Sequence, residues 1–159
     1  MIRVENTVLG MCATNCYVVF DGGAKTPGGY VDDGQVKPAV IIDPAADPAR
    51  IEAMISRYNL RPEAVLLTHG HFDHILAADA VRKRYGIQVY AGAQERQIMT
   101  NESYNLSLPF TGEGMAFEAD EYFEPGEDFS FAGASLTVST VEMHHFLNFI
   151  LTLSEPVSI

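Results

Sequence analysis

The chain has 159 residues, 47% of them hydrophobic and 19% charged, and its formal net charge is −11. This length accommodates one folded domain with a substantial core, and the composition excludes a disordered chain. The strong negative charge disfavours nonspecific binding to nucleic-acid phosphates and to anionic membranes. We therefore expect a single domain over residues 1–159 whose partners include neither nucleic acid nor membrane.

Cysteine usage and the first residues indicate the compartment. Cys12 and Cys16 are the two cysteines, and the chain begins without the apolar stretch of a signal peptide. Their spacing does not match a CxxC redox motif and no second pair accompanies them, so we interpret both as buried structural residues. No apolar run approaches the roughly 20 residues that span a bilayer. We expect a soluble, cytoplasmic protein.

The first third of the chain predicts a hairpin, a surface loop and a strand–helix unit. Residues 2–8 and 16–20 are expected to form two strands, and the glycine-rich residues 21–38 a surface loop. Residues 39–42 form a continuous apolar strand that ends at Asp43. Asp47 should cap a helix with Pro48 in its first turn. The apolar face of this helix would consist of Ile51, Met54 and Ile55.

The middle of the chain continues the alternation of strand and helix. We expect a strand at 64–68, a helix over about 74–85 that ends at Gly86, and a strand from residue 88. A short helical piece near 94–99 precedes an acidic loop over 101–127. Strands at 129–131 and 135–141 should pair antiparallel, and residues 146–153 are typical of an apolar strand. Alternating apolar strands and helices favour an α/β (α+β) fold with a sheet covered by helices.

The most informative stretch is residues 68–74, THGHFDH, directly after the apolar strand at 64–67. His69 and His71 stand two apart in extended chain, so both imidazoles can project to the same side and bind one ion. Asp73 and His74 follow at the start of the helix and can offer a second pair. Two neighbouring dications can polarise a carbonyl or phosphoryl oxygen and activate water. The alternative, that these histidines merely cap a helix, poorly explains three imidazoles and a carboxylate at this spacing.

With the apolar strand before it, THGHFDH resembles the HxHxDH signature of the metallo-β-lactamase-fold hydrolases. Further similarities lie at residues 14–17, 40–44, 105–107 and 123–127, and together they resemble the small glyoxalase-II-like (hydroxyacylglutathione-hydrolase-like) branch from residue 2 to about residue 138. The resemblance implies an αββα sandwich with metals at one edge. It also implies hydrolysis of a small thioester or ester by metal-bound hydroxide, with zinc, in one or two ions, or else iron or manganese.

The same resemblance implies roles for individual residues. One metal would take His69, His71 and a later histidine, and the other Asp73, His74 and residues of the C-terminal half. Asp73 would also orient the attacking hydroxide. Asp43 would lie close by and orient a ligand.

The C-terminal part departs from this family pattern. His144 stands in register with the later histidine but lacks the Pro-Gly turn before it, and His145 is the weaker candidate. The last fourteen residues contain no aspartate or histidine, so we expect an altered or truncated C-terminus and an incomplete second half of the sandwich. The exposed sheet face would then be covered by residues 146–153 or by a homo-oligomer. A catalytically impaired remnant with a partial metal site, or a persulfide-oxidising iron relative, is the alternative function.

Overall fold

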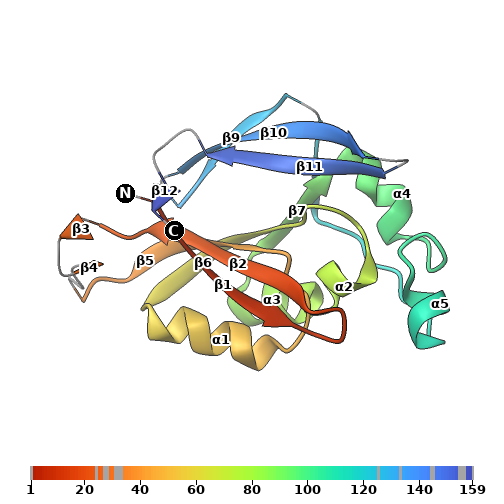
Figure 1. Ribbon diagram of the computed structural model, residues 1–159, viewed down its shortest axis with the longest axis horizontal. Coiled ribbons are helices and arrows are strands. Elements are labelled where there is room, and N and C mark those ends of the chain that lie inside the picture. Colours follow the sequence, from red (N-terminus) through yellow and green to blue (C-terminus); the bar gives the residue numbers. More distant parts are fainter. Residues whose placement is uncertain are drawn as a thin grey trace.

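Figure 1 shows the computed structural model of the chain, which describes residues 2–23, 25–26, 29–30, 34–124, 126–132, 134–143, 146–153 and 157–158. The helices over residues 48–57 and 78–85 lie below a large twisted sheet and a smaller sheet lies above it, which gives three layers (Figure 1). The predicted mixed α/β fold is confirmed.

The larger sheet has the strand order β12-β1-β2-β5-β6-β7-β8. Its strands are β1 (Ile2–Leu9), β2 (Thr14–Asp21), β5 (Lys37–Ile42), β6 (Leu60–Leu66), β7 (Gln88–Gly92), β8 (Glu121–Phe123) and β12 (Val157–Ser158). The pairs β1–β2 and β2–β5 are antiparallel, whereas β5, β6, β7 and β8 run parallel. Because parallel strands end at the same edge, the loops after β5, β6 and β7 meet there, and ligands commonly bind at that edge.

The hairpin of β1 and β2 and the loop after it differ in part from the prediction. Both strands are confirmed, and residues 21–38 carry a short ribbon of β3 (Lys25–Thr26) and β4 (Gly29–Tyr30). Cys16 on β2 is buried, as predicted. Cys12 is exposed, contrary to the prediction, because it lies in the tight turn at residues 10–13, where no other layer covers the hairpin.

The helical layer packs its apolar residues against the lower face of the larger sheet. In α1 (Pro48–Arg57), the side chains of Ile51 and Ile55 are buried, which confirms the predicted face. Asp47 is the residue before the helix, but its side chain makes no capping hydrogen bond, contrary to the prediction. The reason is its backbone, which has a φ of 48° instead of the extended conformation that aims a capping side chain at the helix.

The helix predicted over about 74–85 is two helices, α2 (Phe72–Ile75) and α3 (Ala78–Tyr85). The break follows from a contact outside the helix, because the Ala77 N–H donates to the carbonyl of Pro44 at 2.9 Å in the loop after β5. The end of α3 is as predicted: Gly86 adopts a φ of 65°, a conformation that suits glycine.

The region after β7 is more ordered than the sequence indicated. The short helical piece is confirmed as η1 (Ala93–Glu95) and α4 (Arg96–Met99). The stretch predicted as a loop over 101–127 contains α5 (Ser107–Thr111) and the strand β8. Both elements are too short to produce a clear hydrophobic period, which explains why the sequence pattern missed them.

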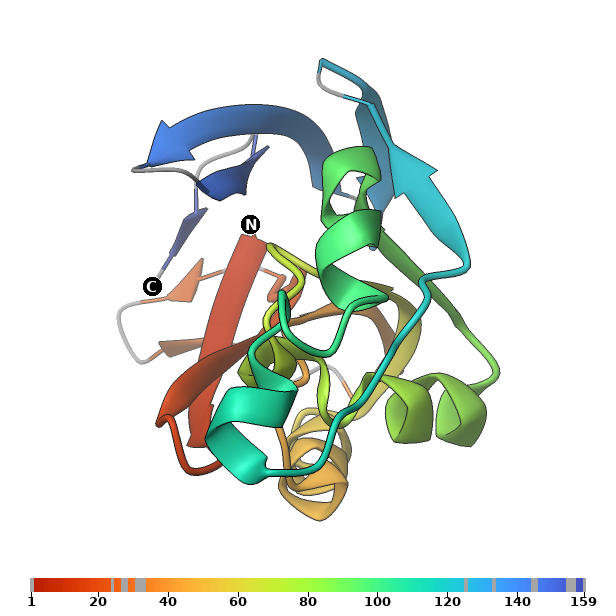
Figure 2. The same cartoon turned by 90° about the vertical axis from the view of Figure 1, so that its right-hand side faces the viewer.

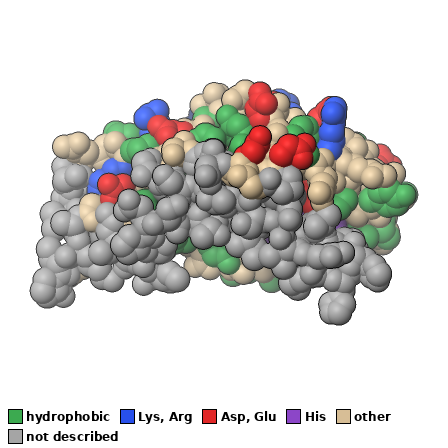
Figure 3. Space-filling view, turned by 90° about the horizontal axis from the view of Figure 1, so that it is seen from above, with side chains coloured by type: hydrophobic (Ala, Val, Ile, Leu, Met, Phe, Trp, Pro, Cys, Tyr) green, Lys and Arg blue, Asp and Glu red, His purple; other side chains and the backbone are tan. Residues whose placement is uncertain are grey.

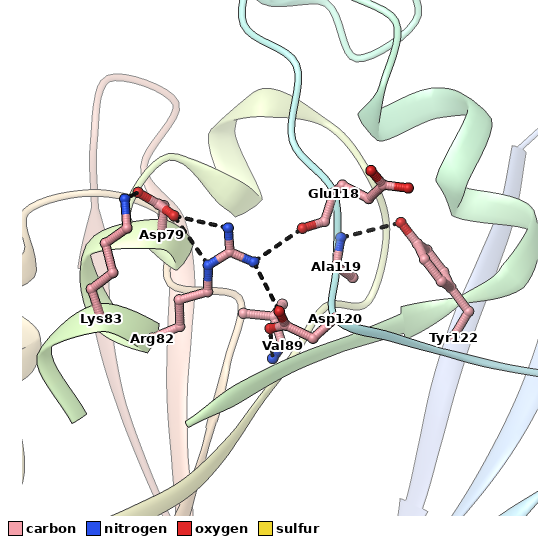
Figure 4. Close-up of polar contacts among 8 residues, drawn as sticks. All are labelled: Asp79, Arg82, Lys83, Val89, Glu118, Ala119, Asp120 and Tyr122. Atoms are coloured by element: carbon pink, nitrogen blue, oxygen red, sulfur yellow. Dashed lines mark hydrogen bonds and ion pairs between the residues drawn. The ribbon is translucent and has the colours of Figure 1, made fainter. Parts of the chain in front are cut away.

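A polar network ties the acidic segment before β8 to the helical layer (Figure 4). Arg82 on α3 donates to the carbonyl of Glu118 at 3.2 Å and to Asp120 Oδ1 at 3.3 Å. The other carboxylate oxygen of Asp120 accepts the N–H of Val89 at 2.8 Å. The segment is therefore fixed against α3 and the start of β7.

The smaller sheet consists of β9 (Asp128–Phe131), β10 (Ala134–Met143) and β11 (Phe146–Leu153), in the order β11-β10-β9 and all antiparallel. The predicted pair and the predicted third strand are thus confirmed. Phe131 and Ala132 pack against Val40 and Leu66 on the inner face of the larger sheet. Figure 2 shows the smaller sheet above the larger one from a second side.

The inner face of the larger sheet is covered within this chain. Ile2, Val19, Val40 and Leu66 all lie on that face and are at most 5% exposed. The smaller sheet, which includes residues 146–153 as β11, lies above the larger sheet (Figure 1), in agreement with one of the two covers that the sequence predicted. A homo-oligomer is not needed to cover them and stays a prediction. Within the described ranges, every helix is too short or too polar to cross a bilayer.

Candidate metal centre

Residues 68–74, here called the histidine loop, follow β6 at the edge where the parallel strands end. The backbone of Leu67 still belongs to the sheet, because its N–H donates to the carbonyl of Tyr90 at 2.9 Å. The chain then leaves the sheet and enters α2 at Phe72. The sequence thus places the predicted cluster at the sheet edge where α/β proteins bind ligands.

The four predicted ligand side chains of this loop lie close together. The ring centroids of His69 and His71 are 4.8 Å apart, and those of His69 and His74 are 3.8 Å apart. Asp73 Oδ2 is 3.6 Å from His74 Nε2. The loop therefore brings three imidazoles and one carboxylate to a single place, as the spacing predicted. Whether they hold a metal stays a prediction.

Asp43 forms hydrogen bonds with both ends of the histidine loop. Its Oδ1 accepts the Thr68 N–H at 2.8 Å, and its Oδ2 accepts the Thr68 hydroxyl. The same Oδ2 contacts His74 Nδ1 at 2.9 Å. Because an ionised carboxylate only accepts hydrogen bonds, this contact places the proton of His74 on Nδ1. Asp43 thus lies where the sequence analysis expected it, in contact with a candidate ligand.

Thr14 is a functional candidate that the sequence analysis did not single out as a site residue. Its hydroxyl donates to Asp73 Oδ2 at 2.5 Å, from β2 across to α2. Thr14 is buried and the Asp73 side chain is 21% exposed, so this bond is partly shielded from water. The one signal in the sequence was its place in the TNCY stretch at residues 14–17.

Three backbone N–H groups of the histidine loop each donate to a different part of the chain. The donors alternate along the loop: Thr68 donates to Asp43, Gly70 to Glu95 Oε2 at 2.7 Å, and Phe72 to the carbonyl of Asn105 at 2.8 Å. These bonds fix the backbone between the candidate ligands before any metal arrives, which is the preorganisation that a site requires.

Asn105 and Glu95, which hold the far side of the loop, were not predicted either. Asn105 is 0% exposed, and its amide donates to the carbonyls of Met99 and Met115 at 3.1 and 2.7 Å. Glu95 is 1% exposed. The available signal for Glu95 was its place four residues before Met99, which puts an acidic side chain on the one buried face of a short helical piece.

Burial keeps two of the imidazoles neutral. It lowers the pKa of His69 to about 4, assisted by the neighbouring charge of His74, and it also lowers the pKa of His71. Burial acts in the same direction on His74, but the hydrogen bond and charge of Asp43 and the charge of Asp73 outweigh it, so the pKa of His74 is raised. A neutral imidazole has the lone pair that a metal needs, so His69 and His71 are in the ligand form at neutral pH.

The contacts of each ring also limit which nitrogen can face a metal. Nδ1 of His74 is engaged by Asp43, and Nδ1 of His69 lies 3.1 Å from the Thr68 hydroxyl, so Nε2 is left on both rings. On His71 the Nε2 atom is buried. The donor set therefore suits a dication such as zinc, with imidazole nitrogens, a carboxylate and fixed tautomers.

The arrangement of these donors is not yet that of a filled site. In the described part of the chain, no group of three or more His, Cys, Asp and Glu side chains already stands in a metal-binding arrangement. The rings of His69 and His74 pack against each other and would have to turn apart to admit an ion. The predicted further ligands His144 and His145 lie outside the described residues.

Comparison with known proteins adds an independent line of evidence. The sequence model of the Metallo-beta-lactamase superfamily matches residues 29–155. Hydroxyacylglutathione hydrolase GloC of Haemophilus influenzae is 36% identical over 67 residues, which are 42% of this chain and 31% of that protein. Exodeoxyribonuclease WalJ of Streptococcus pneumoniae is 28% identical over 91 residues, which are 55% of this chain and 33% of that protein.

A solved structure extends the similarity to most of the fold. The crystal structure of the B3 metallo-beta-lactamase BLEG-1 superimposes with a TM-score of 0.78 at 30% identity, covering 94% of this chain and 66% of that one. The chain spans less than half the length of the curated relatives it matches.

Proposed function

This chain belongs to the metallo-beta-lactamase superfamily, and from that premise we propose that it is a metal-dependent hydrolase of a small thioester or ester. The observation that carries the proposal is the histidine loop, in which His69, His71, Asp73 and His74 are gathered at a sheet edge. The similarity to a relative named hydroxyacylglutathione hydrolase favours a thioester over other acyl substrates.

We assign the ligand roles as the sequence predicted them. His69 and His71 would hold one dication, and Asp73 and His74 would contribute to a second. When bound, the ions would supply Lewis-acid activation of water and of the substrate carbonyl. Zinc is the proposed metal, because imidazole and carboxylate ligands suit it, although the same ligands also accept iron or manganese.

The chain's own groups would prepare this chemistry. Thr14 donates to Asp73 Oδ2 and so fixes the carboxylate in one orientation, which leaves Oδ1 to accept a hydrogen bond from the attacking water. Asp43 holds the proton of His74 on Nδ1 and keeps that ring from rotating freely. Asp73 is therefore the proposed catalytic residue. Thr14 positions its carboxylate, and Asp43 positions the neighbouring ring of His74.

His144 remains the proposed third ligand of the first metal, with His145 as the alternative. Both fall between the end of β10 at Met143 and the start of β11 at Phe146, which pair with each other. Their own positions lie outside the described residues, so the assignment rests on the register of His144 in the sequence.

A nuclease is the second candidate function, because one relative is named an exodeoxyribonuclease. Nucleic-acid substrates are usually held by a basic surface. Among the described side chains on the face shown in Figure 3, basic and acidic groups are interspersed and no broad basic patch is seen. With a net charge of −11, the chain suits a small thioester better than a polyanion.

The test is a hydrolysis assay on the zinc-loaded protein with a hydroxyacyl thioester of glutathione and, in parallel, single- and double-stranded DNA. We expect zinc-dependent release of free thiol, measured with a thiol reagent, and no release by the His69→Ala/His71→Ala variant. Cleavage of DNA without thiol release would favour the nuclease. Zinc-loaded protein that releases no thiol would contradict the proposed function.

A further inference from the structure

Glu95 is a deeply buried carboxylate that makes a single hydrogen bond among the described residues. It is the last residue of η1 and is 1% exposed, among the most deeply buried side chains of the described part. Oε2 accepts the N–H of Gly70, and Oε1 has no hydrogen-bond partner among the described residues. Burying a carboxylate with so little compensation is unfavourable, because the charge loses its hydration.

The unfavourable burial of the Glu95 carboxylate is reflected in its pKa. Burial raises the pKa of Glu95 to about 7, against the lowering effect of the Gly70 N–H. A glutamine side chain has the same length and could accept the same N–H without a charge. Hydrogen bonding to Gly70 alone therefore gives no reason for a carboxylate at this position.

The residue that Glu95 contacts lies between the two candidate ligands His69 and His71. Gly70 is in close contact with α4: a Cβ added to it would lie 2.7 Å from Met99 Cγ and 3.0 Å from Met99 N. The segment from Glu95 to Met99 therefore supports the middle of the histidine loop from behind. A negative charge placed there favours a cation on the other side of the loop.

We propose that Glu95 is a positioning residue of the metal centre, whose buried carboxylate holds His69 and His71 through the Gly70 N–H and favours dication binding by its charge. This inference rests on the proposed function, because it requires that the histidine loop binds a dication. It adds a residue that contacts no candidate ligand side chain and acts through the loop backbone.

The test compares zinc affinity and metal-free stability of Glu95→Gln, which retains an acceptor but removes the charge. Zinc affinity is measured by competition with a chromogenic chelator at about pH 8, above the pKa of Glu95. Thermal unfolding is measured in the presence of a strong chelator. We expect zinc affinity to fall about tenfold or more, the loss typical of groups that support metal ligands, while the metal-free protein is as stable as the unchanged one or more so.

Glu63→Gln is the matched control. Glu63 also accepts a backbone N–H, that of Ala132 at 3.1 Å, but it lies in the middle of β6 (Leu60–Leu66), outside the histidine loop. We expect its zinc affinity to equal that of the unchanged protein.

Each outcome decides the matter. A loss of zinc affinity in Glu95→Gln clearly smaller than about tenfold overturns the inference. A loss of affinity accompanied by an equal loss of metal-free stability also overturns it, because that result describes a structural residue only. Failure of the unchanged protein to bind zinc overturns the proposed function and this inference with it, so the two failures are distinguishable.

Discussion

Replacing Asp43 with asparagine is expected to weaken zinc binding about 10- to 100-fold, the loss typical of a group that orients metal ligands. The carboxylate of Asp43 accepts from the Thr68 N–H, the Thr68 hydroxyl and His74 Nδ1. An asparagine amide turns one of these acceptors into a donor, which then faces other donors in a buried place. His74 would lose its fixed tautomer, and the position of its ring beside Asp73 would no longer be fixed.

Asp47→Asn provides the control for this prediction, because Asp47 is an exposed carboxylate a few residues along the same loop and makes no side-chain capping bond. Asparagine also tolerates its positive φ. Zinc affinity, measured by chelator competition, should fall for Asp43→Asn and not for Asp47→Asn. Equal affinity in both variants would show that Asp43 has no part in metal binding.

Replacing Gly70 with alanine is expected to destabilise the protein by about 1–3 kcal/mol, the usual cost of overpacking a filled interior. The new Cβ would approach Met99 Cγ to 2.7 Å and Met99 N to 3.0 Å, and Met99 is fully buried. Because backbone atoms of α4 cannot rotate away, either α4 or the histidine loop must shift. The same shift would weaken the bond from the Gly70 N–H to Glu95.

Gly114→Ala is the matched control, since the three atoms nearest to a Cβ there all belong to the carboxylate end of the exposed Glu102 side chain, which can move aside. Denaturant unfolding of the metal-free proteins should show a loss for Gly70→Ala and almost none for Gly114→Ala. If Gly70→Ala unfolds at the same denaturant concentration as the unchanged protein, α4 does not confine the loop as described.

The sequence predicted the part of the candidate metal centre whose residues lie close together along the chain. His69, His71, Asp73 and His74 lie within six residues at the end of an apolar strand, so their spacing was enough to predict that they meet. The strands at 39–42 and 64–68, which correspond to β5 and β6, were predicted from their apolar runs in the same way.

The supporting groups were not predictable because they come from distant elements. The hydroxyl of Thr14 reaches Asp73 across 59 positions of sequence, and Glu95 reaches Gly70 across 25. The break between α2 and α3 has a similar origin, since the apolar period continues through Ala77 but its N–H bonds to Pro44 instead. Such contacts depend on how layers pack, which no local pattern contains.

The central claim is that the histidine loop binds a metal, and elemental analysis of zinc after loading and dialysis tests it most directly. We expect the unchanged protein to retain at least one zinc ion per chain, and the His69→Ala/His71→Ala variant to lose the ion that these two imidazoles hold. Circular dichroism should show that the variant keeps its fold. No zinc on the unchanged protein, or equal zinc on a folded double variant, would contradict the account.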